Sequence, residues 1–167
     1  MTRYITIFSL TLLILFTLEL LQPVQINVVE PFTALIAQIS VTLISFFDAN
    51  VISYGKIIQS QTNGFAVSIE PGCNGVEAMI VLTAAVLAFP SSIKQKIAVL
   101  VIGFFAIQIM NLGRIISLFY LGQWHTGIFE WAHLYIWPVL IMVDVLIVFL
   151  LWMKFLPMEV EVAQDAS

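Results

Sequence analysis

The residue with the clearest capacity for chemistry is Cys73, the only cysteine in the chain. It lies in Glu70-Pro71-Gly72-Cys73-Asn74-Gly75-Val76-Glu77, where two glycines let the backbone turn sharply before a helix. A cysteine at a helix N-terminus feels the positive end of the helix dipole, which lowers the thiol pKa and favours thiolate. We therefore expect a reactive Cys73, although a small residue packed in a turn also fits this segment.

A second candidate is Arg114, in the sequence Asn111-Leu112-Gly113-Arg114 within a hydrophobic run. An arginine in such a run is costly and usually marks a function, facing a protein interior or a cavity. The alternative is an arginine near a helix end whose side chain reaches the membrane interface. Asn111 lies on the same helix face, so it could orient Arg114 or hydrogen-bond a substrate.

Two histidines could serve as the base for the cysteine, His125 in the polar stretch 123–127 and His133 in the aromatic stretch 130–138. Either could also sit in an interfacial belt of aromatic residues with its polar tip in water. One cysteine and one histidine at the same depth would form a thiolate–imidazolium nucleophile. Cysteine and histidine are too few for a typical metal site, so we expect neither metal nor cofactor.

Several acidic and amide residues are candidates for supporting roles. Glu70, Asn74 and Glu77 flank the cysteine, and we assign them as substrate-binding or supporting positions. Asp144 lies roughly 16 Å deeper than His133 along a helix, near the bilayer middle. Asp144 and Glu77 fit a structural role better than a catalytic one.

The composition restricts the class of protein. The 167 residues are 61% hydrophobic and 10% charged, which excludes a soluble enzyme because a domain of this size cannot hide so much apolar surface. A single cysteine excludes a disulfide scaffold, and a net charge of −4 gives no basic surface for nucleic acid. We therefore expect an all-α polytopic membrane protein.

Apolar runs of suitable length predict four membrane spans, near 4–22, 75–90, 97–120 and 131–153. The first run could be a signal peptide, but it is too long and no small-x-small cleavage site follows it. The stretch 31–47 is shorter and contains more polar residues. It fits either a poor span or an amphipathic helix at the outer interface, and we predict the latter.

The region between the first two predicted spans contains a turn signal, Asn63-Gly64, flanked by β-type residues at 57–59 and 65–69. We expect a small β-hairpin outside the bilayer. One membrane domain over 1–157 and a disordered acidic tail over 158–167 complete the predicted organisation.

Lysine and arginine gather in cytoplasmic loops, which orients the chain. With four spans, Arg3, Lys94, Lys96 and Lys154 fall on one side and Lys56 on the other; a crossing by 31–47 would move Arg3 to the side of Lys56. The first arrangement has the stronger bias, and it places both chain ends in the cytoplasm.

This topology brings Cys73, Arg114 and His133 to the outer face of the membrane, although the charges that define the orientation belong to other residues. A Pro-Gly-Cys-Asn-Gly motif, then Asn-x-x-Arg, then a histidine at the outer start of the next helix, resembles the exosortase/archaeosortase family over about 70–138. The motif around Cys73 is most similar to that of the short exosortase H branch.

The resemblance implies a cysteine transpeptidase or protease of the cytoplasmic (inner) membrane, with its active site facing the periplasm or exterior. It implies roles for Cys73 as nucleophile, Arg114 as the essential arginine and His133 as the histidine. His133 is preferred to His125 because it begins a helix, as the family's histidine does. The implied partner is the C-terminal sorting signal of an exported protein, with a short motif, a transmembrane helix and a basic tail.

Two other classes fit the apolar runs. One is a non-enzymatic membrane protein, such as an assembly factor or channel subunit, which would leave the convergence of the three residues as coincidence. The other is a small transporter using Asp144 and Arg114, but no repeat symmetry is visible in the sequence.

Overall fold

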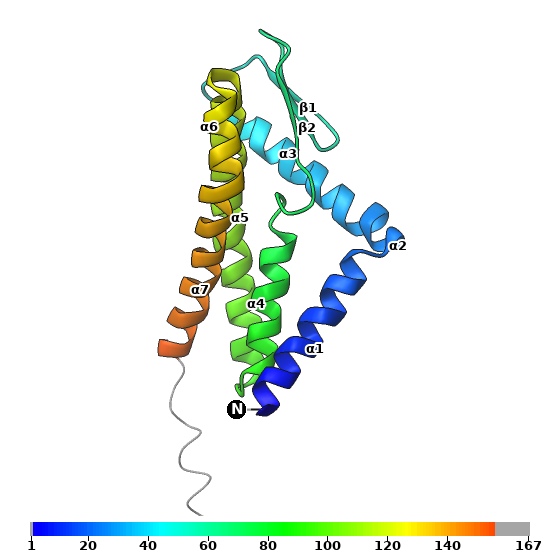
Figure 1. Ribbon diagram of the computed structural model, residues 1–167, viewed down its shortest axis with the longest axis vertical. Helices are drawn as coiled ribbons and strands as arrows, with labels where there is room; N and C mark the ends of the chain where they lie inside the picture. The colour runs from blue at the N-terminus through cyan, green and yellow to red at the C-terminus, as the bar shows by residue number, and fades with distance from the viewer. Residues whose placement is uncertain (1, 156–167) are drawn as a thin grey trace, which may run out of the picture.

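The computed structural model describes residues 2–155; the predicted acidic tail over 158–167 lies outside this range. The chain folds mainly into helices, with one small sheet (Figure 1). The helices are α1 (Thr2–Glu19), α2 (Gln22–Val24), α3 (Glu30–Ile44), α4 (Val76–Ala88), α5 (Ile93–Trp124), α6 (Thr126–Trp131) and α7 (Trp137–Phe155). Two single π-helical turns, η1 (Gln25–Val29) and η2 (Ala132–Ile136), and the strands β1 (Val51–Tyr54), β2 (Ile57–Ser60) and β3 (Ala66–Ser68) complete it. The predicted fold class is confirmed.

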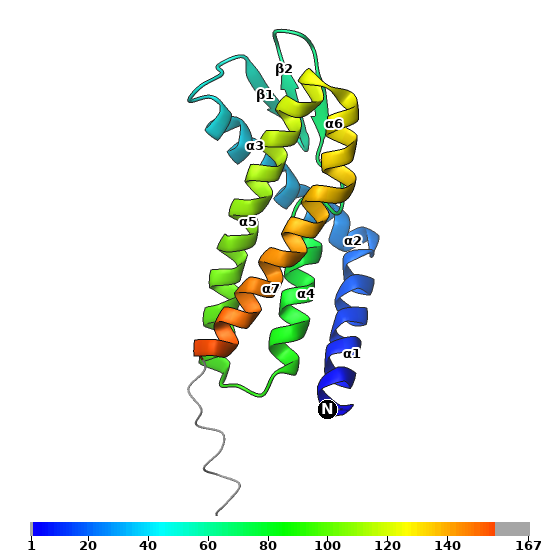
Figure 2. The same cartoon turned by 60° about the vertical axis from the view of Figure 1, so that its left-hand side comes forward.

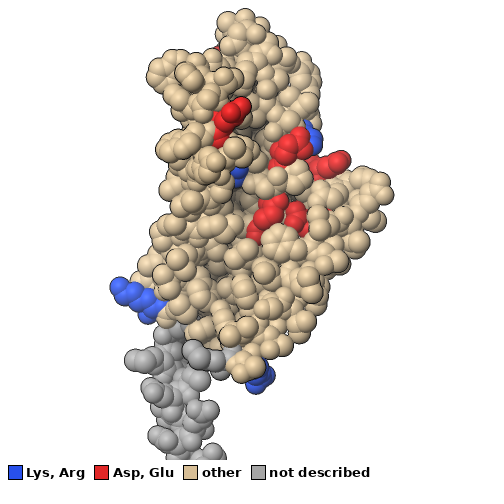
Figure 3. Space-filling model, in the orientation of Figure 1, with Lys and Arg blue, Asp and Glu red and all other residues tan. Residues whose placement is uncertain are grey.

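Helices α4, α5 and α7 pack side by side, and α1 packs against α4 (Figures 1 and 2). Their shared core contains Leu82, Val86, Ile107, Ile141 and Val145, all at most 5% exposed. The outward-facing side chains of the same helices are large, apolar and exposed. Figure 3 shows a surface almost free of charged side chains over the middle of these helices. Such a belt suits the hydrocarbon of a bilayer.

The predicted hairpin is present, since β2 and β3 pair antiparallel with Ile58 opposite Val67. Gly64 has a φ of 74°, which explains the glycine at this turn. The sheet also contains β1, which pairs with β2 and which the sequence reading missed. A second core joins this sheet to α3 and the outer half of α5, with Ile44, Ile58 and Phe119 fully buried in it.

The helices long and apolar enough to cross a membrane are not the four that were predicted. Within the described part of the chain they cover Thr2–Glu19, Gln22–Ile44, Ile93–Trp124 and Thr126–Phe155. The predicted span 75–90 contains only the 13-residue α4, about 20 Å long against a hydrocarbon core of about 30 Å. The sequence underrated the second helix because α2 and η1 continue it back to Gln22, well before residue 31. In Figures 1 and 2, α3 runs oblique to α4 and α5, across the end that carries the sheet.

Both π-helical turns end shortly before a proline. The N–H of Glu30 bonds the carbonyl of Gln25 ahead of Pro31, and the N–H of Trp137 bonds the carbonyl of Ala132 ahead of Pro138. Proline cannot donate to a helix and its ring clashes with the carbonyl four residues earlier. A wider turn relieves that clash without ending the helix.

The ends of the elements separate the two ends of the molecule. The start of α1, the α4–α5 connection and the end of α7 lie together, opposite the sheet and α6 (Figures 1 and 2). Arg3 and Lys96 line one surface pocket there. The cationic residues that the charge pattern assigned to one side therefore belong to elements that meet at one end of the fold.

Candidate active site

Cys73 lies in a tight loop just before α4. Gly72 and Gly75 have φ values of 85° and 81°, a conformation that other residues rarely adopt. At Gly75 a Cβ atom would also come within 2.7 Å of Nε2 of Gln108, so a larger residue would have to displace the end of that side chain. The two glycines thus shape the turn around the cysteine, as the sequence predicted.

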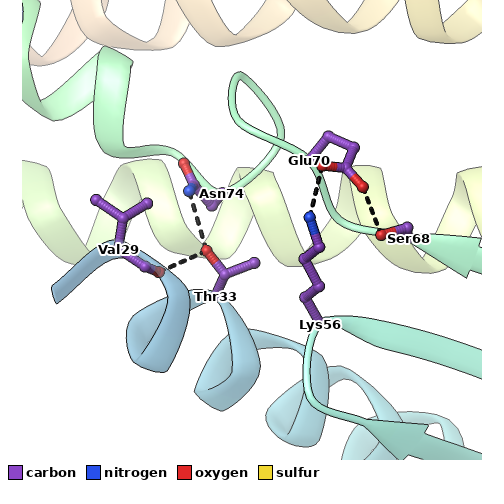
Figure 4. Close-up of polar contacts among 6 residues, drawn as sticks. All are labelled: Val29, Thr33, Lys56, Ser68, Glu70 and Asn74. Atoms are coloured by element: carbon purple, nitrogen blue, oxygen red, sulfur yellow. Dashed lines mark hydrogen bonds and ion pairs between the residues drawn. The ribbon is translucent and has the colours of Figure 1, made fainter. Parts of the chain in front are cut away.

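Asn74 anchors this loop to two other helices. Its Oδ1 accepts the N–H of Val76 at 3.0 Å, which satisfies a donor at the start of α4. Its Nδ2 donates to Thr33 Oγ1 on α3 at 3.0 Å (Figure 4), and its carbonyl accepts from Gln108 on α5 at 3.3 Å. Asn74 is only 1% exposed. It therefore supports the position of Cys73 and lines neither cavity described below.

Arg114 holds the other side of the same loop. Its Nη1 donates to the carbonyl of Gly72 at 2.8 Å and its Nη2 donates to Sγ of Cys73 at 3.2 Å. The residue is 5% exposed, so it is not an arginine reaching out to the interface. The guanidinium contacts the candidate nucleophile directly, which an anchoring role does not require.

The two glutamates of the motif differ in their contacts. Glu77 accepts the N–H of Gly72, so the backbone at Gly72 is held by Glu77 and Arg114 together. Glu70 is exposed, and its two oxygens accept from Lys56 and Ser68, each at 2.6 Å (Figure 4). These bonds hold the pKa of the Glu70 carboxyl below its usual value. Both residues therefore shape the loop, and Glu70 stays charged.

A cavity of about 370 Å³, which we call the outer cavity, joins the three predicted residues. Cys73, Arg114 and His133 line it together with Glu70, Phe129 and Glu130. His133 stacks on Phe129 with ring centroids 5.7 Å apart and planes 1° from parallel. Its Nδ1 is buried and has no hydrogen-bond partner within residues 2–155. The histidine is thus held beside the cavity with a free ring nitrogen.

His125 has a different role. It precedes α6, and its Nδ1 accepts the N–H of Ile128 at 3.4 Å, as a helix cap does. It is exposed and does not line the outer cavity. Geometry therefore favours His133 over His125 as the partner of the cysteine.

The expectation of a lowered thiol pKa at Cys73 is wrong in this structure. Burial raises the pKa of the thiol above its ordinary value; the Arg114 guanidinium opposes this, while Glu77 and Glu70 add to it. The helix begins at Val76, so Cys73 lies outside the first turn, and its N–H bonds the carbonyl of Glu70 at 2.9 Å. The dipole effect falls off over such a distance.

Asn111 and Asp144 lie deeper in the bundle. Asn111 is fully buried, yet neither atom of its amide has a hydrogen-bond partner in the described chain, so it does not orient Arg114 through a bond. Asp144 lines a separate apolar groove between α5 and α7 and not the outer cavity. The same part of the chain contains no group of three or more His, Cys, Asp or Glu that could hold a metal ion.

Sequence reasoning missed Thr33, Gln108 and Phe129, which anchor the cysteine loop and the histidine. Thr33 and Gln108 lie 41 and 34 residues from Asn74 in the chain, so no local spacing reveals these contacts. Phe129 precedes His133 by four residues, a helical spacing that could have indicated the stacking.

The sequence matches the family model described as transmembrane exosortase over residues 2–153. Comparisons with curated proteins and with solved structures found no match. Because the family match covers nearly the whole chain, the protein belongs to the transmembrane exosortase family. It is accordingly a multi-pass membrane protein and, in general terms, a membrane-embedded sorting transpeptidase that acts on exported proteins.

Proposed function

We propose that Cys73, Arg114 and His133 carry out cysteine transpeptidation or proteolysis on C-terminal sorting signals of exported proteins, at the outer face of the cytoplasmic membrane. The observation that carries the proposal is the direct hydrogen bond from Arg114 to Sγ of Cys73 in a cavity that His133 also lines. The charge pattern of the chain ends supports the orientation.

In the proposed reaction, His133 removes the proton from the Cys73 thiol, which needs a base because burial raises its pKa. The sulfur attacks the carbonyl carbon of the scissile peptide bond. The C–N bond then breaks, the C-terminal fragment leaves as an amine with the proton from His133, and a thioester remains. An amine or water attacks that thioester and restores the thiol.

Arg114 stabilises the negative charge at two stages. Its Nη2 donates a hydrogen bond to Sγ of Cys73, so it stabilises the thiolate once His133 has removed the proton, and the same cation is near the oxyanion that forms on attack. The ring of His133 makes no hydrogen bond to Cys73 within the described residues. Catalytic hydrogen bonds are often long or unformed before substrate binds, and we expect this pair to close on a bound substrate.

The test is processing of an exported reporter that ends in a transmembrane sorting signal, in cells producing wild type, Cys73→Ala or His133→Ala. We expect both variants to insert and accumulate normally while processing stops. A mass of the mature reporter C-terminus identifies the cleaved bond and any attached group. Continued processing by Cys73→Ala would overturn the proposal.

A further inference from the structure

A second, smaller cavity lies on the other side of Arg114. It has a volume of about 150 Å³, and we call it the inner cavity. Its walls include Gly72, Glu77, Asn111, Pro138 and Met142, from the cysteine loop, α4, α5 and α7. Arg114 lines both the inner and the outer cavity. The arginine that contacts the nucleophile is therefore the boundary between two parts of one site.

The inner cavity contains polar groups without partners. Asn111 is 0% exposed, and neither its Nδ2 nor its Oδ1 has a hydrogen-bond partner among residues 2–155. Nε of Arg114 is likewise buried without one. Buried amides are nearly always hydrogen-bonded, and leaving one unpaired is costly. A fully unpaired carboxamide beside a cavity indicates a ligand that supplies both a donor and an acceptor.

The position of the inner cavity indicates which part of a substrate would reach it. Asn111 lies one helical turn before Arg114, toward the Ile93 end of α5, and Pro138 lies beyond His133 toward the end of α7. In the proposed orientation this direction leads from the outer face into the membrane. A substrate with an exported domain and a C-terminal membrane helix would place residues before the scissile bond in the outer cavity and residues after it in the inner cavity.

We propose that Asn111 hydrogen-bonds a backbone peptide unit of the substrate on the C-terminal side of the bond that Cys73 attacks. This proposal rests on the proposed function. The substrate must be extended at the attacked bond and helical only further on, so peptide groups between these points lack helical partners. Unpaired peptide groups are costly at membrane depth. The carboxamide offers one donor group and one acceptor, the same pair that a peptide unit offers in return. The cavity has room for about five waters, or one small residue.

The experiment uses the full chain in vesicles and a synthetic peptide as the probe. The peptide copies the C-terminal segment of an exported protein that wild-type cells process, with the cleaved bond located by mass. In separate peptides, each of the first three peptide units after that bond is replaced by an ester, which removes one N–H donor. The enzymes are wild type, Asn111→Leu, which keeps the size, and Asn111→Asp, which removes the amide donor.

We expect Asn111→Leu to lower kcat/KM about tenfold, the scale for a buried polar group left unpaired. One ester position should cause a similar loss in wild type and almost none in Asn111→Leu, because the two changes remove the same bond. The rate of Cys73 alkylation by iodoacetamide should be unchanged in Asn111→Leu. Ser117→Ala is the control. The substitution removes only an intrahelical hydrogen bond to the carbonyl of Arg114, and Ser117 lines neither cavity.

Activity of Asn111→Leu within twofold of wild type would overturn this inference. The inference would also be overturned if every ester position lowered kcat/KM by the same factor in Asn111→Leu as in wild type. If Asn111→Leu fails to accumulate, Asn111→Asp is the second test: it lacks the amide donor, so kcat/KM should fall, but its carboxylate still accepts a peptide N–H, so the sensitive ester position should still cause its loss. Activity of Asn111→Asp within twofold of wild type would then overturn the inference. A failure of the proposed function is distinguishable, because wild type and Cys73→Ala would then process the all-amide peptide equally.

Discussion

The guanidinium of Arg114 donates a hydrogen bond from Nη2 to Sγ of Cys73 over 3.2 Å. The cation that was expected to stabilise the transition state thus directly contacts the nucleophile. Its second terminal nitrogen holds the backbone carbonyl of Gly72. One side chain therefore fixes both the charge environment and the position of the thiol.

Replacement of Arg114 by lysine should nearly abolish processing, by about 10²–10³-fold in rate, the cost of removing one oxyanion donor. Lysine carries one nitrogen and cannot place two donors in the fixed geometry that reaches Gly72 and Cys73 together. The measurement is reporter processing per unit of membrane-inserted enzyme, with Arg114→Ala alongside. Near-normal activity in Arg114→Lys would reduce the arginine to a positive charge without geometric function.

The pH dependence of Cys73 alkylation should reflect the burial of the thiol. Because the pKa of the thiol is raised, the alkylation rate of wild type should still be increasing above about pH 8.5. The pKa of an ordinary cysteine thiol is about 8.5. Arg114→Ala removes a cation that favours thiolate, so the profile should move to higher pH. Glu77→Gln removes a nearby negative charge and should move it to lower pH. Shifts in the same direction would contradict this account.

The two histidines should separate in function. His133→Ala should stop processing without changing membrane insertion. His125→Ala removes the cap of α6, so it should reduce stability by about 1 kcal/mol and leave processing per folded enzyme near normal. Thermal unfolding in detergent and reporter processing measure the two effects. Loss of processing in His125→Ala but not in His133→Ala would show that His125, and not His133, is the base.

The bond between Asn74 and Thr33 should contribute to the position of the cysteine loop. Thr33→Val leaves the Asn74 amide without that acceptor and should destabilise the protein by about 1–3 kcal/mol. Asn74→Ala should cost a similar amount, and the double variant should cost less than the sum. Unfolding in detergent measures all three; Ser45→Ala, at the exposed residue that follows α3, is the matched control. Full additivity would exclude coupling through this bond.

The proposed orientation can be checked with one introduced cysteine. Thr62 lies in the exposed β2–β3 turn. On a Cys73→Ala background, Thr62→Cys should react with a membrane-impermeant thiol reagent added to intact cells, with the outer membrane permeabilised where there is one. Labelling only after the inner membrane is opened would reverse the orientation.

The sequence predicted the helical membrane fold, the hairpin and the shared location of Cys73, Arg114 and His133. Those predictions depend on local signals: apolar run length, Asn63-Gly64, and the order of charged residues along the chain. The thiol pKa was predicted wrongly because it depends on how far the loop is buried and on where α4 begins. Neither property is encoded in the spacing of Gly72, Cys73 and Gly75 alone.

The limits of hydropathy are visible in α4 and α3. The run containing α4 is apolar enough for a span, but Pro90 and the glycine turn at 75 leave only 13 helical residues. The run containing α3 looked short because polar residues dilute it over 31–47, whereas α2 and η1 continue the helix back to Gln22. Strand β1 was missed although Val51, Ile52 and Tyr54 are typical strand residues and the two-residue turn Gly55-Lys56 joins it to β2.

The π-helical turn η2 has a consequence for how this site can vary among related chains. Each residue of an α-helix advances about 100° around the axis, and a π-helical turn accommodates one extra residue. Deleting one residue between His133 and Pro138 would restore the regular repeat. The imidazole would then point about a quarter-turn away from the side that Cys73 occupies. Substitutions at the other positions of this turn preserve the rotational phase between His133 and α7, but a single-codon deletion there changes it, so apart from His133 this turn should tolerate exchange of residues far better than loss of one.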